Sequence, residues 1–253
     1  MQFFRIYPDA IAPMKAEKSA LGNLPTAAFQ YCEPIRTASA YGWLVFPPID
    51  IRLRFDGTES LVWDEAESRW NPLGHRYFND AFWEKWDDEV PPDFKSVRIP
   101  YLSPTFASGV IQIWTGLLVE TEPGHCTHVK PIANVFNHSS FHIYEGIVDT
   151  DVHKPWPLFG NLKLVATDRE IQLDRTVPLF QVQPVARESL QPNQCHGKVT
   201  DVLGNLNELG ETGLFDRLRW NGLATTVRDA DATKPRRTAD YAAKSRRRGR
   251  DEA

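Results

Sequence analysis

Histidine and carboxylate side chains gather in one stretch of the chain, residues 124–164. This stretch holds five of the seven histidines, which are His125, His128, His138, His142 and His153. It also holds Cys126 and the acids Glu145, Asp149 and Asp151. Imidazole and carboxylate groups bind transition metals and transfer protons near neutral pH. The sequence therefore predicts a metal-binding or catalytic site here.

Part of this stretch has the pattern of a half-buried strand. Residues 147–153 alternate between apolar or hydroxyl side chains and more polar ones, so neighbouring side chains would face opposite sides. Val148, Thr150 and Val152 would share one face. The other face would carry two carboxylates and an imidazole, from Asp149, Asp151 and His153.

A mononuclear metal site is the leading hypothesis. Non-haem iron is often held by two histidines and one carboxylate, which leaves positions open for oxygen and substrate. Asp151 and His153 would bind Fe(II) or another divalent metal, and His138 or His142 would complete the site. Asp149 would act as a catalytic base or orient a ligand. The His-x-His spacing usual in cupins and the His-x-Asp dyad of oxygenases are both absent from the chain.

Three alternatives use the same residues. Cys126 could be a nucleophile between His125 and His128, although adjacent side chains on a strand point apart. Asp149 and Asp151 could work as an acid–base pair, as in glycoside hydrolysis. In the third alternative, the histidines and acids have no chemical role and lie on a solvated strand face and in a polar loop.

Other chemistry is not indicated. The chain has no phosphate-binding loop, dinucleotide fingerprint, Cys-x-x-Cys pair or EF-hand. Nucleotide cofactors and structural zinc are therefore not expected.

The pattern of the whole chain favours a mainly β fold. Short strand candidates alternate with turn residues and no long amphipathic helix precedes residue 200, which indicates an antiparallel sandwich or barrel over residues 1–190. Residues 110–119 are the most apolar and should be central. Residues 9–35 are expected to form a loop. The main strand candidates are residues 3–7, 42–46, 49–55, 60–63, 110–119, 158–165, 170–173 and 177–185.

Two segments depart from this pattern. Residues 64–96 are rich in aromatic side chains, and a short helix over 80–86 would place Phe82, Trp83 and Trp86 on one face, where they pack on the core or stack on a ligand. After residue 190, a helical appendage (191–230) and a disordered basic tail (231–253) are expected. Between Lys234 and Ala253 there are eight basic residues and three acids, although the whole chain carries a formal charge of −4.

The composition limits the kinds of partner that the chain is expected to bind. The body is acidic, so nucleic-acid binding is not expected apart from the basic tail, which could also contact an acidic surface or simply aid solubility. No apolar run approaches the ~18 residues of a membrane span, and no secretory signal is visible. Three widely spaced cysteines suggest reduced thiols in the cytoplasm. A small-molecule or peptide substrate is expected, and an oligomer is compatible with the sequence.

Four segments resemble a bacterial family known as a domain of unknown function. They are CEPIRTASAYGWLVFPPIDIRLRFDG, IQIWTGLLVETEPG, YEGIVDTD and PLFQVQPVARE, and the resemblance spans residues 1–190. It implies a β-rich, cupin-like or jelly-roll fold and no particular reaction. Asp151 fits the family pattern. His125 and His128 depart from it, because an apolar or aromatic strand is expected at their positions.

Two functions follow as expectations. The first is a cytoplasmic, cupin-like, metal-dependent enzyme, with oxygenase chemistry on a small molecule or peptide. The second is a non-catalytic binding or assembly module, which would use the aromatic segment 63–94 or the C-terminal helices.

Overall fold

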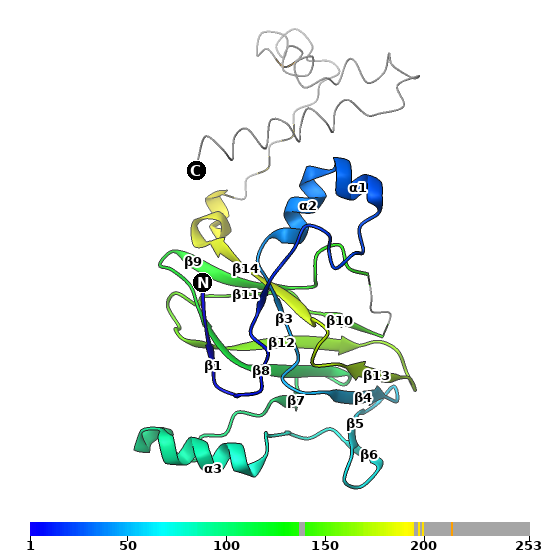
Figure 1. The fold of residues 1–253 in the computed structure, drawn as a ribbon, viewed down its shortest axis with the longest axis vertical. Coiled ribbons are helices and arrows are strands. Elements are labelled where there is room, and N and C mark those ends of the chain that lie inside the picture. Colours follow the sequence, from blue (N-terminus) through cyan, green and yellow to red (C-terminus); the bar gives the residue numbers. More distant parts are fainter. Residues whose placement is uncertain (137–139, 195–196, 198, 200–213, 215–253) are drawn as a thin grey trace.

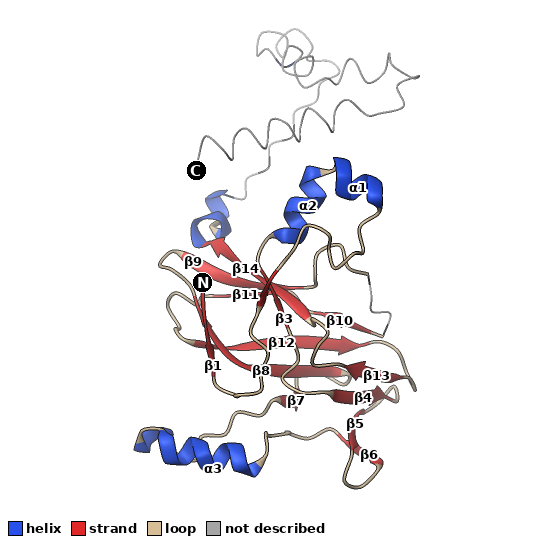
Figure 2. Cartoon of the chain, viewed as in Figure 1, coloured by secondary structure: helices blue, strands red, loops and turns tan. Residues whose placement is uncertain are grey.

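The computed structural model describes residues 1–136 and 140–194, together with residues 197, 199 and 214. In this part of the chain the strands form three sheets, and every strand pair is antiparallel. Short helices lie at the periphery (Figure 1, Figure 2). The mainly antiparallel β class is confirmed, whereas the cupin-like or jelly-roll form stays a prediction.

Sheet A is built around the strand that the sequence predicts to be central. Its order is β1-β8-β12-β10, and β7 also pairs with β8. Most side chains of β8 are buried, and β1, β7 and β12 all pair with it. The strands are β1 (Gln2–Arg5), β7 (Leu102–Pro104), β8 (Val110–Glu120), β10 (Phe141–Ile143) and β12 (Trp156–Leu164).

Sheet B packs face to face with sheet A. Its order is β11-β9-β14-β3-β2. The two sheets are close where the Phe180 ring meets Gly160 of β12, since a Cβ added at Gly160 would lie 2.7 Å from that ring. The strands are β2 (Met14–Lys15), β3 (Trp43–Val45), β9 (His125–Lys130), β11 (Gly146–Val148) and β14 (Phe180–Ala186).

Sheet C contains the predicted hairpin. Its order is β13-β4-β5-β6, and β4 pairs with β5. Buried and half-buried residues alternate along β4, with Leu53 fully buried, as expected of a strand with one wet face. The strands are β4 (Ile51–Phe55), β5 (Ser60–Asp64), β6 (Arg69–Pro72) and β13 (Glu170–Leu173). One core cluster includes residues of all three sheets.

The predicted loop over residues 9–35 is wrong at β2 and again from Thr26 onward. Helices α1 (Thr26–Tyr31) and α2 (Glu33–Ala40) form there and lie beside sheet B (Figure 1). Pro25 and Pro34 suggested a loop, but proline is tolerated at a helix start, where its missing N–H has no intrahelical partner. The amide of Gln181 on β14 anchors the end of α2 by donating to the Tyr41 carbonyl at 2.6 Å.

The predicted aromatic helix is confirmed as α3 (Asp80–Glu89), on the side of the molecule opposite α1 and α2 (Figure 1). The Asn79 side chain caps it by accepting the Phe82 N–H at 2.9 Å. Trp83 is buried, and Phe82 and Trp86 pack against the core. These three rings are therefore used in packing. Among the described residues, no helix is both long and apolar enough to cross a bilayer.

Three short 3-10 turns complete the described elements, at Pro92–Phe94, Arg187–Leu190 and Pro192–Gln194. Almost all of the predicted appendage (191–230) and the whole of the predicted tail (231–253) lie outside the described residues.

Candidate functional site

β9 carries chemistry-bearing side chains on both faces of sheet B. It lies between β11 and β14. Thr127 and Val129 line a cavity shared with sheet A. Because side chains alternate along a strand, Cys126 and His128 belong to the opposite face.

The strand predicted over residues 147–153 ends at Val148, so this prediction is wrong for all but its first two residues. The N–H groups of Val152 and His153 both bond to the Asp149 carbonyl, at 3.1 and 2.9 Å, and turn the chain before β12. Thr150 is fully buried whereas Val152 is 61% exposed, so the predicted common face does not exist. The alternation of residue types in the sequence extends beyond Val148, although the backbone hydrogen bonds of the strand end there.

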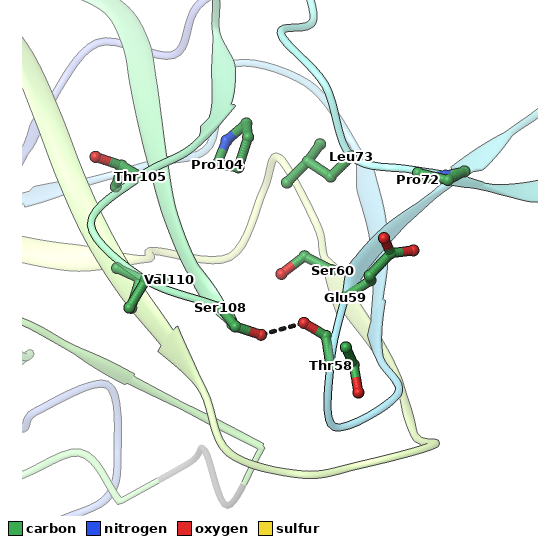
Figure 3. Close-up of a pocket in the computed structure, with 11 residues that line it drawn as sticks. Thr58, Glu59, Ser60, Pro72, Leu73, Pro104, Thr105, Ser108 and Val110 are labelled. Carbon is green, nitrogen blue, oxygen red and sulfur yellow. Dashed lines mark hydrogen bonds between the residues drawn. The ribbon is translucent and has the colours of Figure 1, made fainter.

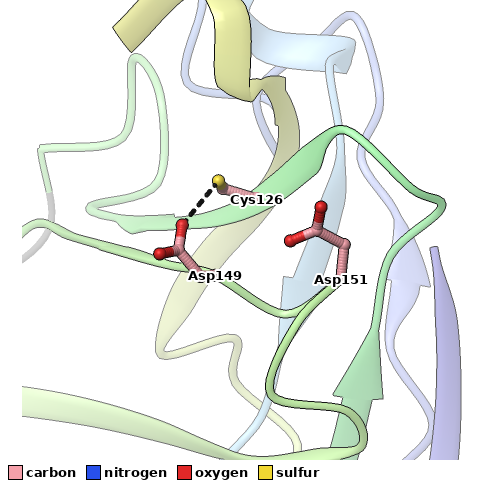
Figure 4. A group of neighbouring side chains, drawn as sticks. All are labelled: Cys126, Asp149 and Asp151. Atoms are coloured by element: carbon pink, nitrogen blue, oxygen red, sulfur yellow. Dashed lines mark hydrogen bonds between the residues drawn. The ribbon is translucent and has the colours of Figure 1, made fainter. Parts of the chain in front are cut away.

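The turn nevertheless brings both aspartates to Cys126 (Figure 4). Potential ligand atoms of Cys126, Asp149 and Asp151 all lie within 4.8 Å of one another. The Cys126 thiol donates to Asp149 Oδ1 at 3.0 Å. Asp151 Oδ2 accepts the N–H of Gly124 at 2.9 Å, which ties the turn to the start of β9.

Arg187 offsets part of the negative charge of this cluster. It follows β14 directly, and its guanidinium donates to the Asp151 carboxylate and lies 3.4 Å from Asp149 Oδ1. The Asp151 side chain is only 7% exposed. Burial alone would raise the pKa of Asp151, but the Gly124 N–H and the charge of Arg187 outweigh it and hold that pKa below its usual value.

The same environment acts in the opposite sense on the thiol. Burial, together with the hydrogen bond and the negative charge of Asp149, raises the pKa of Cys126 to about 11. A thiolate is the form that attacks electrophiles and binds metals. Cys126 therefore keeps its proton near neutral pH, which argues against the nucleophile alternative.

The predicted histidine ligands lie elsewhere. His142 is an exposed residue on β10, opposite Lys163. His153 lies in the exposed turn, with its ring 6.0 Å from that of Trp156. Neither belongs to the group that contains Asp149 and Asp151, and His138 lies outside the described residues.

As it stands, the cluster does not fit a divalent cation. The guanidinium of Arg187 occupies the position of a cation beside both carboxylates, and the thiol is protonated. A metal would have to displace Arg187 and deprotonate Cys126. The same ion pairing leaves Asp151 unsuited to accept a proton, since its pKa is lowered.

A chain of buried hydroxyl groups connects the turn to the space between sheets A and B. Thr121 Oγ1 donates to the His125 carbonyl at 2.6 Å, Thr150 Oγ1 lies 2.8 Å from Thr121 Oγ1, and Thr127 Oγ1 lies 2.8 Å from Thr150 Oγ1. Each hydroxyl has one proton to donate. Since Thr121 gives its proton to a carbonyl, Thr150 must donate to Thr121, and Thr127 to Thr150.

Thr127 and Thr150 line a cavity of about 320 Å³ between sheets A and B, referred to below as the A–B cavity. It lies where the chain leaves β10 in sheet A and enters β11 in sheet B, through Tyr144 and Glu145. Its rings come from Tyr144, Trp156 and Phe159. Its lining residues are Gln112, Val119, Thr127, Val129, Tyr144, Glu145, Gly146, Val148, Thr150, Trp156, Pro157, Leu158, Phe159 and Asn161.

Two polar pairs border this cavity, and a third adjoins one of them. The Gln112 amide donates to Asn161 Oδ1 at 3.1 Å. On the rim, Glu145 Oε2 lies 3.0 Å from His128 Nε2. The other ring nitrogen of His128, Nδ1, lies 3.2 Å from the Gln183 amide nitrogen.

A second cavity, of about 380 Å³, lies between the β4–β5 loop and the β7–β8 loop (Figure 3). The hydroxyl of Ser108 donates to the Thr58 carbonyl and joins the two loops. Its lining offers prolines, small hydroxyl side chains and one carboxylate, from Glu59, but no aromatic ring. This cavity is slightly larger, yet fewer groups that could recognise a ligand converge on it.

The sequence did not single out several of these residues. Arg187 belongs to the PVARE segment and carries no motif, and Tyr144 and Trp156 read as isolated aromatics. The signal that could have found Arg187 is the charge balance, because a buried carboxylate requires a cationic partner. No protein-family model matches the chain, and no curated protein is significantly similar to it.

Proposed function

We propose that the chain binds a small organic molecule in the A–B cavity. The observation that carries this proposal is the convergence of three aromatic rings with two hydroxyls, two amides and one carboxylate on a cavity of about 320 Å³. Ligand sites are typically concave, roughly 300–1,000 Å³, and lined by apolar and aromatic side chains with a few placed polar groups. The proposal belongs to the binding-module class, with the aromatic residues of β12 and the β10–β11 connection in place of segment 63–94.

Screening the full-length chain with small organic fragments by two-dimensional amide NMR tests the proposal. Fragments that bind should shift the amide signals of Gly146, Val148 and Thr150, which line the A–B cavity. Replacing Trp156 with Leu should weaken those shifts. Fragments that shift only residues around Ser108, or none at all, would overturn the proposal.

A second candidate is the metal-dependent enzyme, with the oxygenase chemistry expected from the sequence. The observation in its favour is the proximity of Cys126, Asp149 and Asp151, which concerns ion binding and not catalysis. Because Arg187 is ion-paired with both carboxylates, we expect the untagged chain to hold little metal. An ion would bring Lewis acidity or redox chemistry to this face of sheet B.

Elemental analysis of the untagged chain separates the two candidates. Arg187→Gln should raise the affinity for Zn²⁺ or Fe²⁺ if the cluster can bind a cation, since it removes a competing positive charge. The double variant Asp149→Asn/Asp151→Asn should then lose the ion. Stoichiometric metal in the unaltered chain, lost in a His138→Ala/His142→Ala/His153→Ala variant, would instead support the histidine site.

A further inference from the structure

The lining of the A–B cavity also indicates the chemical class of its ligand. We infer that the cavity recognises an organic cation, a small molecule that carries an ammonium group. This inference rests on the proposed function and makes it more specific. It follows from the charge of the lining, from the direction of the hydroxyl chain and from the aromatic rings.

The first argument is charge. Among the residues that line the cavity, Glu145 is the one with a charged side chain, and none is lysine, arginine or histidine. Its hydrogen-bonding partner His128, with Nε2 3.0 Å from Glu145 Oε2, is not among the lining residues. The one formal charge among the lining residues is therefore negative. A cationic ligand is attracted and an anionic one is repelled.

The second argument is the direction of the hydroxyl chain. Thr121 donates to the His125 carbonyl, so each later hydroxyl must donate toward Thr121. The proton of Thr127 is therefore used, and its oxygen offers only lone pairs to the cavity that it lines. A polar ligand group beside Thr127 must be a donor, such as a hydroxyl group or an ammonium N–H.

The third argument is the set of rings. Tyr144 and Trp156 are 49% and 40% exposed, although they line the cavity, so their rings are accessible to a ligand. Phe159 adds a half-buried ring. Cations bind to the faces of aromatic rings, and tryptophan binds them best. Rings of this kind together with one carboxylate suit an alkylated ammonium better than a strongly hydrated metal ion.

Calorimetric titration of the full-length chain with choline and with 3,3-dimethylbutan-1-ol tests the inference. The two probes have nearly the same shape, and only choline is charged. Choline should bind more tightly, by roughly 2- to 30-fold, the range that cation–π attraction covers from exposed to desolvated sites.

Variants assign this difference to the cavity. Glu145→Gln should lower the affinity for choline and leave that for the alcohol unchanged, and Trp156→Leu should weaken both. Trp156→Phe keeps a ring and should restore part of the choline affinity. Glu59→Gln removes a carboxylate from the other cavity and serves as the matched control, which should change neither affinity. Unfolding midpoints of all variants check that they fold.

The outcomes separate the inference from the proposed function. Equal affinity for the two probes, or binding of neutral fragments alone at the A–B cavity, overturns the organic cation and leaves small-molecule binding standing. Choline binding that is unchanged in Glu145→Gln and Trp156→Leu also overturns the inference. If neither probe nor any fragment shifts the amide signals of Gly146, Val148 and Thr150, both the inference and the proposed function are wrong.

Discussion

The cluster of Cys126, Asp149, Asp151 and Arg187 shows how neighbours decide the chemistry of a side chain. Asp151 is almost fully covered and remains ionised because an N–H group and a guanidinium reach it. Cys126 lies beside the same carboxylates and becomes a weaker acid. The carboxylates alone suggested a metal site, whereas in the structure the cation beside them is the guanidinium of Arg187.

The thiol of Cys126 should resist alkylation in the folded chain. With a pKa of about 11, its thiolate fraction at pH 8 is on the order of 10⁻³, and the side chain is fully buried. Cys32 is partly exposed and should react first. Peptide mass mapping after iodoacetamide treatment, with and without denaturant, measures both. Rapid labelling of Cys126 in the native chain would contradict the assigned environment.

The Asp151–Arg187 pair should stabilise the fold at neutral pH and lose that effect in acid. The folded pKa of Asp151 lies below its unfolded value of about 3.9, so the contribution is complete above that value and disappears as pH falls through the folded pKa. Asp151→Asn should therefore lower the thermal unfolding midpoint at pH 7, and the difference should shrink below about pH 4.

Asp168→Asn is the control for this pH dependence. Asp168 pairs with Arg54 at 2.9 Å, but its side chain is 64% exposed, so solvent screens the pair. The control should change the midpoint much less. Equal effects of the two substitutions across the pH range would show that burial of Asp151 contributes nothing.

At the scale of elements, two departures from regular strands shape the site and the core. The turn after β11 brings Asp149 and Asp151 to β9 and places Thr150 in the hydroxyl chain. Within β8, Gly116 has φ of +75°, and its carbonyl accepts the N–H groups of Ile6 and Tyr7. Such an irregularity lets a long central strand hold the chain that follows β1.

Gly116→Ala should destabilise the fold by about 2–4 kcal/mol, from the unfavourable φ and from overpacking. A Cβ at this position would lie 2.7 Å from the Cβ of Tyr7 and 3.3 Å from that of Ala10. Gly22→Ala is the matched control, because Gly22 has φ of +80° and nothing within 4 Å of an added Cβ. Urea denaturation measures both, and equal losses would mean that the contact with Tyr7 has no cost.

At the scale of the molecule, the three sheets share one core, and the A–B cavity lies where the chain passes between two of them. All buried members of the core cluster among the described residues lie between Tyr7 and Val182. The extent of the β domain, residues 1–190, stays a prediction. The helical appendage and the tail stay predictions.

A chain shortened to end at Gln194 should therefore fold cooperatively, with an unfolding midpoint close to that of the full chain. Its core would contain every buried apolar residue of the cluster. Calorimetric unfolding of the two chains at equal concentration measures the difference. A clearly lower midpoint, or loss of cooperativity, would show that residues after 194 complete the core.

The sequence by itself determined the local elements whose patterns are strong. The alternation of β4 and the apolar run of β8 were predicted, because burial on one or both faces restricts residue type directly. The stretch that contains the candidate site was also recognised, since Cys126, Asp149 and Asp151 are close in the chain.

Tertiary structure decided which of these side chains meet. Arg187 is 36 residues from Asp151 and reaches it only because β14 pairs with β9. His142 and His153 are near Asp151 in sequence, yet His142 belongs to sheet A and His153 lies in the exposed turn before β12. The cavity itself exists because the chain changes sheet between β10 and β11. Residue spacing does not encode such a crossing, since it depends on long-range strand pairing.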